Sequence, residues 1–201
     1  MLEIFYREEM KRLERYQFLK KDSYSFMKKA GDRVYKFISS NFENKTKIIV
    51  LCGPGNNGGD GFVVANLLKK NGYPVKVYTY GKKNIYKGDA LKAFNEYRGN
   101  FKKINFIKLE KGAVIIDALF GIGLIRNIKG NLNKIIKKIN SKTNSVISVD
   151  IPSGVCSNTG NILGRAIKAD FTIAFHRKKL GHTIGYGKNY CGKIKVVNIG
   201  F

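Results

Sequence analysis

The residues from Lys47 to Lys70 constrain the fold of this chain more than any other stretch. They begin with a β-branched and aliphatic run, Lys47–Cys52, which is typical of a strand buried on both faces. Gly53–Gly61 follows with five glycines in nine residues, and Phe62–Lys70 then has apolar residues at helical spacing. A strand, a tight glycine loop and a helix predict the first half of a βαβ unit, whose loop and helix N-terminus attract anions.

The glycine loop contains the dinucleotide-binding pattern G-x-G-x-x-G at Gly53, Gly55 and Gly58, but its usual companion is missing. In ordinary NAD-binding folds an acidic residue ends the second strand and holds the ribose. Here that strand, predicted over Val75–Tyr80, ends without an acid, which disfavours ordinary NAD binding. A P-loop is excluded because no Lys-Ser/Thr pair follows the glycines. A tight turn without a ligand is the simpler alternative.

The rest of the chain alternates between predicted helices and predicted strands. Two amphipathic helices are expected first, one over Leu2–Leu19 and one from a cap at Asp22 or Ser23 to Ile38. Further helices are predicted over Gly88–Tyr97 and Leu132–Ile139, and further strands over Asn105–Leu109, Ala113–Phe120, Ser145–Ile151, Ala169–Phe175 and Lys193–Ile199. This alternation predicts an α/β fold with a mainly parallel sheet and helices on both faces, and the length fits one domain over residues 1–201.

The formal net charge of +24 raises the question of a nucleic-acid partner. The lysines occur in every segment, however, without a dense cluster of arginines and aromatic residues. We therefore expect a solvated basic surface and no nucleic-acid partner. Such a field still attracts small anionic ligands such as nucleotides.

The cysteines and the apolar runs indicate the cellular compartment of the protein. Cys52, Cys156 and Cys191 are scattered and form no C-x-x-C pair, so neither a disulfide framework nor a zinc site is indicated. A reducing compartment fits best. The first ten residues have no signal-peptide pattern, and no apolar run reaches membrane-spanning length. We therefore expect a cytoplasmic protein without membrane contact.

Polar side chains interrupt the ends of three predicted strands. Asp117 and Asp150 stand inside otherwise aliphatic runs, where a carboxylate is costly unless it is paired or hydrogen-bonded. Because the carboxyl ends of parallel strands meet at one edge of the sheet, both should lie near Asn57 and Asp60. Each aspartate alone could be a turn former or a helix cap. Together, these four residues favour a shared site.

Three motifs resemble those of the NAD(P)H-hydrate epimerase family, also called the YjeF N-terminal domain. They are CGPGNNGGDGF at Cys52–Phe62, DALFGIG at Asp117–Gly123 and VDIPSG at Val149–Gly154. Weaker similarity is found at Met27–Gly31, Phe175–His182 and Tyr190–Phe201, so the resemblance extends over nearly the whole chain. It implies a Rossmann-like three-layer αβα sandwich that forms a homodimer. The implied activity is epimerisation of the R and S forms of hydrated NADH or NADPH, alongside a separate NAD(P)H-hydrate dehydratase.

The resemblance also implies roles for particular residues. The implied substrate contacts are Asn56, Asn57, Gly58, Gly59 and Asp60, then Gly121, Ile122, Gly123, Leu124, Ile125, Arg126 and Asn127, and finally Asp150. A potassium ion is implied near Asn57, Asp117 and Ser153. Asp150 is our candidate for proton transfer, and Lys179 is a second catalytic candidate that could instead be an ordinary surface lysine. Ile122 departs from the family, which more often has a small polar residue there.

Two other readings of the chain stay open at this point. The fold could serve as a non-catalytic binding or scaffold module with RNA or protein partners, which the positive charge favours. The presence of Asn57, Asp117, Asp150 and Ser153 argues against that function, since a scaffold does not need this costly polar cluster. Alternatively, the chain is the front half of a bifunctional epimerase–dehydratase, and the sequence does not decide between that and a standalone enzyme.

Overall fold

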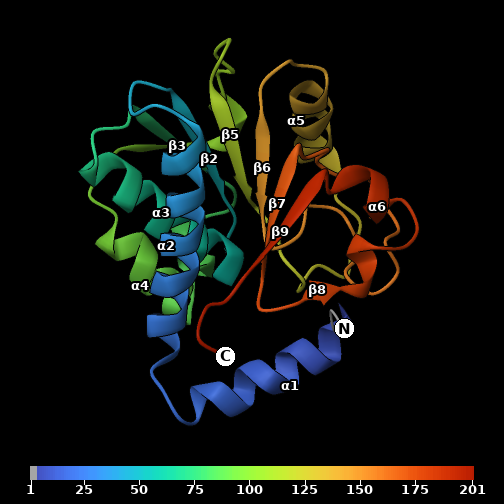
Figure 1. Cartoon of the computed structure of the whole chain (residues 1–201). Helices are drawn as coiled ribbons and strands as arrows, with labels where there is room; N and C mark the ends of the chain where they lie inside the picture. The colour runs from blue at the N-terminus through green and yellow to red at the C-terminus, as the bar shows by residue number, and fades with distance from the viewer. Residues whose placement is uncertain (1–3) are drawn as a thin grey trace.

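Seven parallel strands form the central sheet of the protein, which is described for residues 4–201 in a computed structural model (Figure 1). Their order across the sheet is β4-β3-β2-β5-β6-β7-β9. Their bounds are β2 (Ile48–Cys52), β3 (Val75–Thr79), β4 (Phe101–Lys103), β5 (Val114–Ala118), β6 (Val146–Val149), β7 (Phe171–Phe175) and β9 (Lys193–Val197). A separate parallel pair joins β1 (Ile4–Phe5) to β8 (Lys178–Lys179). The expected parallel sheet is confirmed.

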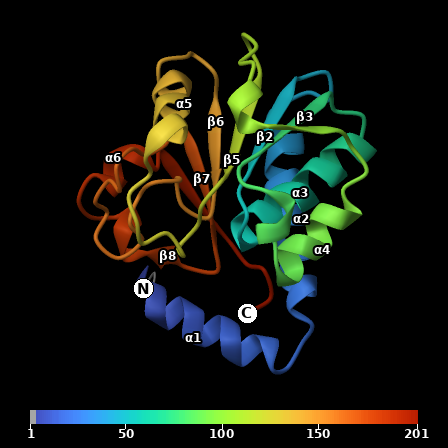
Figure 2. The same cartoon turned by 180° about the vertical axis from the view of Figure 1, so that it is seen from behind.

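Helices cover both faces of the sheet, as Figures 1 and 2 show from opposite sides. One face is packed with apolar residues of α2 (Ser23–Asn41), α3 (Asn56–Lys70) and α4 (Gly88–Glu96). The opposite face is packed with α5 (Gly130–Asn140). The remaining helices are α1 (Arg7–Phe18), the short α6 (Gly187–Tyr190) and the 3-10 turns η1 (Lys83–Ile85), η2 (Ile104–Phe106) and η3 (Leu180–His182). The molecule is therefore the three-layer αβα sandwich that we predicted.

The order of the strands reverses between β2 and β5. From β2 the chain moves outward through β3 and β4, and it then returns to β5 on the other side of β2. At such a switch point the connections leave the sheet in opposite directions, which opens a crevice at the carboxyl ends of the strands. The glycine segment follows β2, and the Asp117 motif ends β5. Both motifs therefore meet at the crevice.

Helix α3 begins at Asn56, six residues before the predicted start at Phe62. Glycine has a low intrinsic helix propensity, which is why the sequence suggested a loop. The glycines are instead required by packing: a Cβ on Gly58 would lie 1.8 Å from the carbonyl oxygen of Gly53, and one on Gly59 would lie 2.6 Å from Met27. Close contact with neighbouring segments thus overrides local propensity.

Two further predictions at the level of elements were wrong. The strand expected over Asn105–Leu109 is replaced by β4, which ends at Lys103, and by the turn η2. The first helix was expected from Leu2, which lies outside the described residues, but Ile4–Phe5 is a strand and the helix starts at Arg7. Strand β8 and helix α6 were not predicted, because both are too short to show a periodic pattern. The cap at Asp22 is confirmed, since its side chain accepts a hydrogen bond from the Tyr24 N–H.

Helix α1 lies across the carboxyl edge of the sheet and not on either sheet face (Figures 1 and 2). Met10 is its one fully buried residue, and Tyr16 is 53% exposed. We expected the first two helices to pack either on the sheet or on a partner subunit. Helix α2 packs on the sheet, whereas α1 does not.

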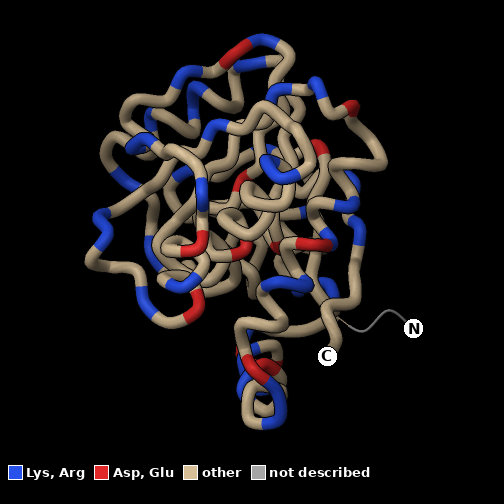
Figure 3. Tube along the Cα trace, turned by 90° about the vertical axis from the view of Figure 1, so that its left-hand side faces the viewer, with Lys and Arg blue, Asp and Glu red and all other residues tan. Residues whose placement is uncertain are grey.

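Basic residues are spread along the whole fold (Figure 3). This distribution matches the even spread of lysines in the sequence. Within residues 4–201, every helix is too short or too polar to span a bilayer.

The first prediction concerns the contact between the turn after β2 and the end of β5. The Gly53 N–H donates to the Ala118 carbonyl oxygen, and a Cβ on Gly53 would lie 1.7 Å from the Leu119 carbonyl oxygen. We expect Gly53→Ala to lower the free energy of unfolding by at least about 1–3 kcal/mol, because backbone atoms must move apart. Urea unfolding measures this change.

The matched control for this variant is Gly123→Ala. A Cβ at Gly123 meets nothing within 4 Å, and its φ is not positive. The control should stay within about 0.5 kcal/mol of the unmodified protein. Equal stabilities of the two variants would contradict the proposed role of the close contact.

Candidate functional site

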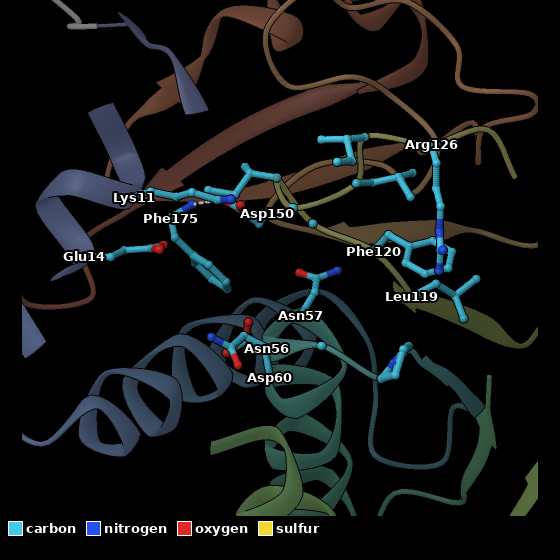
Figure 4. A pocket seen from close by; sticks show the side chains of 17 residues that line it. Lys11, Glu14, Asn56, Asn57, Asp60, Leu119, Phe120, Arg126, Asp150 and Phe175 are labelled. Atoms are coloured by element: carbon cyan, nitrogen blue, oxygen red, sulfur yellow. Dashed lines mark hydrogen bonds between the residues drawn. The ribbon is translucent and has the colours of Figure 1, made fainter. Parts of the chain in front are cut away.

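A cavity of about 570 Å³ opens at the switch point between β2 and β5 (Figure 4). The N-terminus of α3 forms its floor, the loop after β5 forms another wall, and α1 closes one side. The residues that line it are Lys11, Glu14, Pro54, Gly55, Asn56, Asn57, Asp60, Leu119, Phe120, Gly121, Ile122, Gly123, Leu124, Ile125, Arg126, Asp150 and Phe175. Its volume suits a ligand of nucleotide size.

Most predicted substrate-contact residues lie on this cavity. Asn56, Asn57 and Asp60 line it from α3, residues 121–126 line it from the loop after β5, and Asp150 lines it from the end of β6. Gly58 and Gly59 do not line it, because they face Gly53 and Met27 inside the protein. Asn127 lines a smaller neighbouring cavity of about 160 Å³. These three residues therefore support the walls and do not form the surface of the main cavity.

Asp150 is held rigidly at the edge of the cavity. Its φ of 64° lies in the left-handed region, which aspartate and asparagine tolerate better than other non-glycine residues. Its Oδ1 accepts hydrogen bonds from the Lys179 ammonium and, at 3.1 Å, from the Phe175 N–H. Within residues 4–201, the other carboxylate oxygen, Oδ2, has no hydrogen-bond partner. The carboxylate is therefore fixed through one oxygen, and the other is available to a ligand.

Lys179 is fully buried, with 0% of its surface exposed. The alternative that Lys179 is an ordinary surface lysine is therefore wrong. Its ammonium pairs with Asp150 and also donates to the Phe175 carbonyl oxygen at 2.9 Å. A buried lysine with these partners stabilises a negative charge at Asp150.

His182 holds the backbones of Lys179 and Asp150, the two residues of this ion pair. The Lys179 N–H donates to His182 Nδ1 at 2.9 Å, so the proton of the neutral ring lies on Nε2, which donates to the Asp150 carbonyl oxygen at 2.9 Å. Burial, followed by the nearby charge of Lys179, lowers the pKa of His182 to about 4. His182 is therefore neutral at pH 7 and acts as a hydrogen-bonding support.

Asp117 and Ser153 form the second polar cluster, directly beneath the cavity wall. The Asp117 carboxylate is fully buried and accepts bonds from Ser148 Oγ at 2.9 Å, Ser153 N–H at 2.8 Å and Ser153 Oγ at 2.5 Å. The Leu119 N–H donates a fourth bond at 3.3 Å. Burial raises the pKa of Asp117, and the hydrogen bonds from Ser153 and Ser148 oppose that effect. No cationic side chain among residues 4–201 pairs with this carboxylate.

The residues around Asn57 fit the binding of a small hard cation. The Ser153 hydroxyl contacts both the N–H and the carbonyl oxygen of Phe120, and a Cβ on Gly121 would lie 3.2 Å from Asn57 Oδ1. Asn57, Ser153 and Asp117 are thus connected through residues 120–121. Asn57 Nδ2 is buried and has no hydrogen-bond partner in the described part of the chain, and turning the amide would present an oxygen there. Oxygen ligands next to an uncompensated carboxylate suit an alkali cation.

A site for a metal that prefers His or Cys ligands is not found among the described residues. Across residues 4–201, His, Cys, Asp and Glu side chains form no cluster of three or more that could hold a metal ion.

Comparison with known proteins identifies the family. The family model described as "YjeF-related protein N-terminus" matches residues 23–181. The chain belongs to this family. The resemblance noted in the three sequence motifs is therefore confirmed.

Relatives within the YjeF N-terminal family have names that refer to NAD(P)H-hydrate. The chain is 38% identical to the "NAD(P)H-hydrate epimerase" of Lentilactobacillus buchneri, over 87% of this chain and 82% of that protein. It is 37% identical to the "Bifunctional NAD(P)H-hydrate repair enzyme Nnr" of Coxiella burnetii and 36% identical to that of Dictyoglomus turgidum. The matches cover 88% and 96% of this chain but 37% and 39% of those relatives. The chain thus spans under two fifths of each bifunctional relative.

A solved structure shares the YjeF N-terminal fold of this chain. The yeast protein ynu0 superposes with a TM-score of 0.75 over 100% of this chain and 94% of its own, at 21% sequence identity. At this identity the similarity supports the fold alone.

Several residues that line the cavity were not among the predicted substrate contacts. They are Lys11 and Glu14 of α1, Pro54 and Gly55 before α3, Leu119 and Phe120 after β5, and Phe175 at the end of β7. Pro54, Gly55, Leu119 and Phe120 lie inside the quoted motifs and could have been included on that ground. Lys11 and Glu14 precede residue 23, where the family match begins, so no motif pointed to them.

Proposed function

We propose that this chain is an epimerase that interconverts the R and S forms of hydrated NADH and NADPH. The observation that carries the proposal is the joint position of Asn57, Asp60 and Asp150 on one cavity of nucleotide size at the switch point of the sheet. The names of the relatives in the same family support it. Fold alone does not determine function, so the proposal depends on these side chains and on family membership together.

The proposed reaction breaks and remakes one carbon–oxygen bond. The substrate carries a hydroxyl on the ring carbon beside the ring nitrogen. Protonation of this hydroxyl allows the nitrogen lone pair to expel water, which leaves a planar iminium ion. Water that adds to the other face gives the opposite epimer. The enzyme must therefore supply proton transfer, which we assign to Asp150, and negative charge that stabilises the iminium.

The cavity also has features that suit the phosphate groups of the substrate. Gly55 and Asn56 stand at the N-terminus of α3, where backbone N–H groups and the helix dipole favour anions. Arg126 lies on the opposite side, beside Phe120 (Figure 4). The net charge of +24 adds a long-range attraction for a dinucleotide.

A coupled assay tests the proposed activity. The chain is mixed with both epimers of the hydrate and a dehydratase that consumes only the S form. Rapid consumption of the whole mixture supports the proposal, whereas a fast first phase followed by only the spontaneous conversion of the R form overturns it. RNA binding with a steep salt dependence and without turnover would favour the scaffold alternative instead.

We also propose that a potassium ion binds beside Asn57, Asp117 and Ser153. The carboxylate of Asp117 is buried and has no cationic partner among the described residues, and the residues around it offer carbonyl, amide and hydroxyl oxygens. When bound, the ion supplies a fixed positive charge next to the cavity. The homodimer, the cytoplasmic location and the single domain over residues 1–201 stay predictions.

A potassium-dependent stability is the second prediction. An ion that binds only the folded chain raises the thermal midpoint, so the midpoint should be higher in KCl than in choline chloride at equal ionic strength. We expect Asn57→Leu to weaken the ion's affinity by at least about 10–100-fold. The exposed Asn105→Leu serves as the control and should respond to KCl like the unmodified protein. Equal midpoints of the unmodified protein in both salts would argue against the ion.

A further inference from the structure

Helix α1 brings two charged side chains to the cavity from outside the part of the chain that the family model matches. Lys11 and Glu14 lie one turn apart on α1, and both line the cavity. Figure 4 shows them on the α1 side of the cavity, near Asp150 and Phe175. No role in the proposed reaction has so far been given to either residue.

Helix α1 is attached to the rest of the fold at both of its ends. At its start, Phe5 of β1 pairs with Lys179 of β8, and the Arg7 N–H donates to Asn158 Oδ1 at 2.7 Å. At its end, the ring of Phe18 packs against Phe26 with centroids 5.8 Å apart. The segment that holds the Asp150–Lys179 pair therefore also anchors the helix that carries Glu14. The backbone of the helix that carries Glu14 is thus held relative to this segment.

The carboxylate of Glu14 is free to meet a ligand. Within residues 4–201 it forms no hydrogen bond and no ion pair, although it faces the cavity. Burial, followed by the negative charge of Asp150, raises the pKa of Glu14 to about 7, while Lys179 and Lys11 oppose the rise. Asp60 faces the same space from α3, and burial and the charges of Asp150 and Glu14 raise its pKa as well. Glu14 can therefore hold or release a proton near neutral pH.

The proposed reaction needs proton transfer on both faces of the ring. Water leaves from one face of the iminium and returns to the other. Asp150 is held by Lys179, by the Phe175 N–H and by its own left-handed backbone, so it cannot move from one face to the other. A fixed carboxylate reaches one face, so the other face needs a second proton carrier, and among the described residues Glu14 and Asp60 are the other two carboxylates that line the cavity.

We propose, resting on the epimerase function above, that Glu14 is the second catalytic acid and base. In one direction the hydroxyl oxygen takes a proton from Glu14 and leaves as water with the electron pair of the broken carbon–oxygen bond. The lone pair of the ring nitrogen forms the C=N bond of the iminium. A water on the opposite face then forms the new carbon–oxygen bond, returns the C=N pair to nitrogen and gives its proton to Asp150.

The reverse direction uses the same groups with exchanged roles. In each forward turnover Glu14 loses one proton and Asp150 gains one. Proton exchange with solvent then returns a proton to Glu14 and removes one from Asp150. In the direction in which Glu14 is the acid, the active state carries a proton on Glu14. On the alkaline side the rate falls as this proton is lost.

The third prediction follows for Glu14→Gln, which keeps the shape of the side chain and removes its proton transfer. We expect kcat to fall by about 10²–10⁴-fold with KM nearly unchanged. The alkaline limb near pH 7 should also disappear from the pH profile. Arg12→Gln, on the same helix, is the control and should keep the unmodified rate and profile, since Arg12 is exposed and does not line the cavity. Both epimers are followed by direct separation, and thermal midpoints verify folding.

The outcomes of this experiment separate the two proposals. No turnover by the unmodified protein overturns the epimerase function and the role of Glu14 with it. Turnover by the unmodified protein with equal turnover by Glu14→Gln overturns the role of Glu14 alone. Glu14→Ala, which favours the helix, repeats the test if Glu14→Gln does not fold, and a preserved alkaline limb in that variant also overturns the role.

Discussion

Asp150→Asn is expected to lower epimerase turnover by about 10²–10⁴-fold, the range typical for loss of a general acid or base. Asparagine is the mildest replacement at this position, because it tolerates the left-handed φ of 64° and its Oδ1 can still accept from the Phe175 N–H. What it cannot do is take up a proton from water. The coupled assay with the S-specific dehydratase measures the change.

The control for Asp150→Asn is Asp32→Asn. Asp32 lies on the exposed side of α2 and pairs with Lys36 at 3.0 Å on the surface, so its replacement should leave turnover unchanged. Full turnover by Asp150→Asn would remove Asp150 from the mechanism, and it would leave Glu14 as the one remaining acid or base of the pair.

The long central strands could be predicted because their residue pattern is simple. Strands β2 and β5 are buried along their whole length, so aliphatic residues occur there without alternation. Their common carboxyl edge follows from parallel pairing, which is why Asn57, Asp60 and Asp150 could be expected on one site. The start of α3 was not predictable from helix propensity. Its glycines are needed because a Cβ at Gly58 or Gly59 would clash with Gly53 or Met27, and these contacts form only in the folded chain.

The charged residues on the cavity were harder to predict than the strands. Lys179 lies on a two-residue strand in a chain rich in lysine, and no local pattern distinguishes a buried lysine from an exposed one. Glu14 lies on a mainly exposed helix, where glutamate is common. Lys179 is important because it pairs with Asp150, and Glu14 because it lines the cavity. Both neighbourhoods are formed by tertiary structure.

The buried ion pair of Asp150 and Lys179 is expected to contribute strongly to the stability of the protein. Lys179→Met keeps most of the side-chain volume but leaves the Asp150 carboxylate without its cation, in a site where Lys179 is 0% exposed and Asp150 is 7% exposed. Breaking a buried ion pair from one side costs about 3–5 kcal/mol, because an uncompensated charge stays buried. We expect a loss of this size in the free energy of unfolding, measured by urea denaturation.

The double variant Asp150→Asn/Lys179→Met separates stability from catalysis. Removing both charges takes away the desolvation cost together with the attraction, so the double variant should be more stable than the sum of the two single losses predicts. Its turnover should stay as low as that of Asp150→Asn, because no proton carrier has returned. Strictly additive losses of stability would show that the two side chains do not compensate each other. Recovered turnover would show that Asp150→Asn had lost activity through the stranded lysine and not through the missing carboxylate.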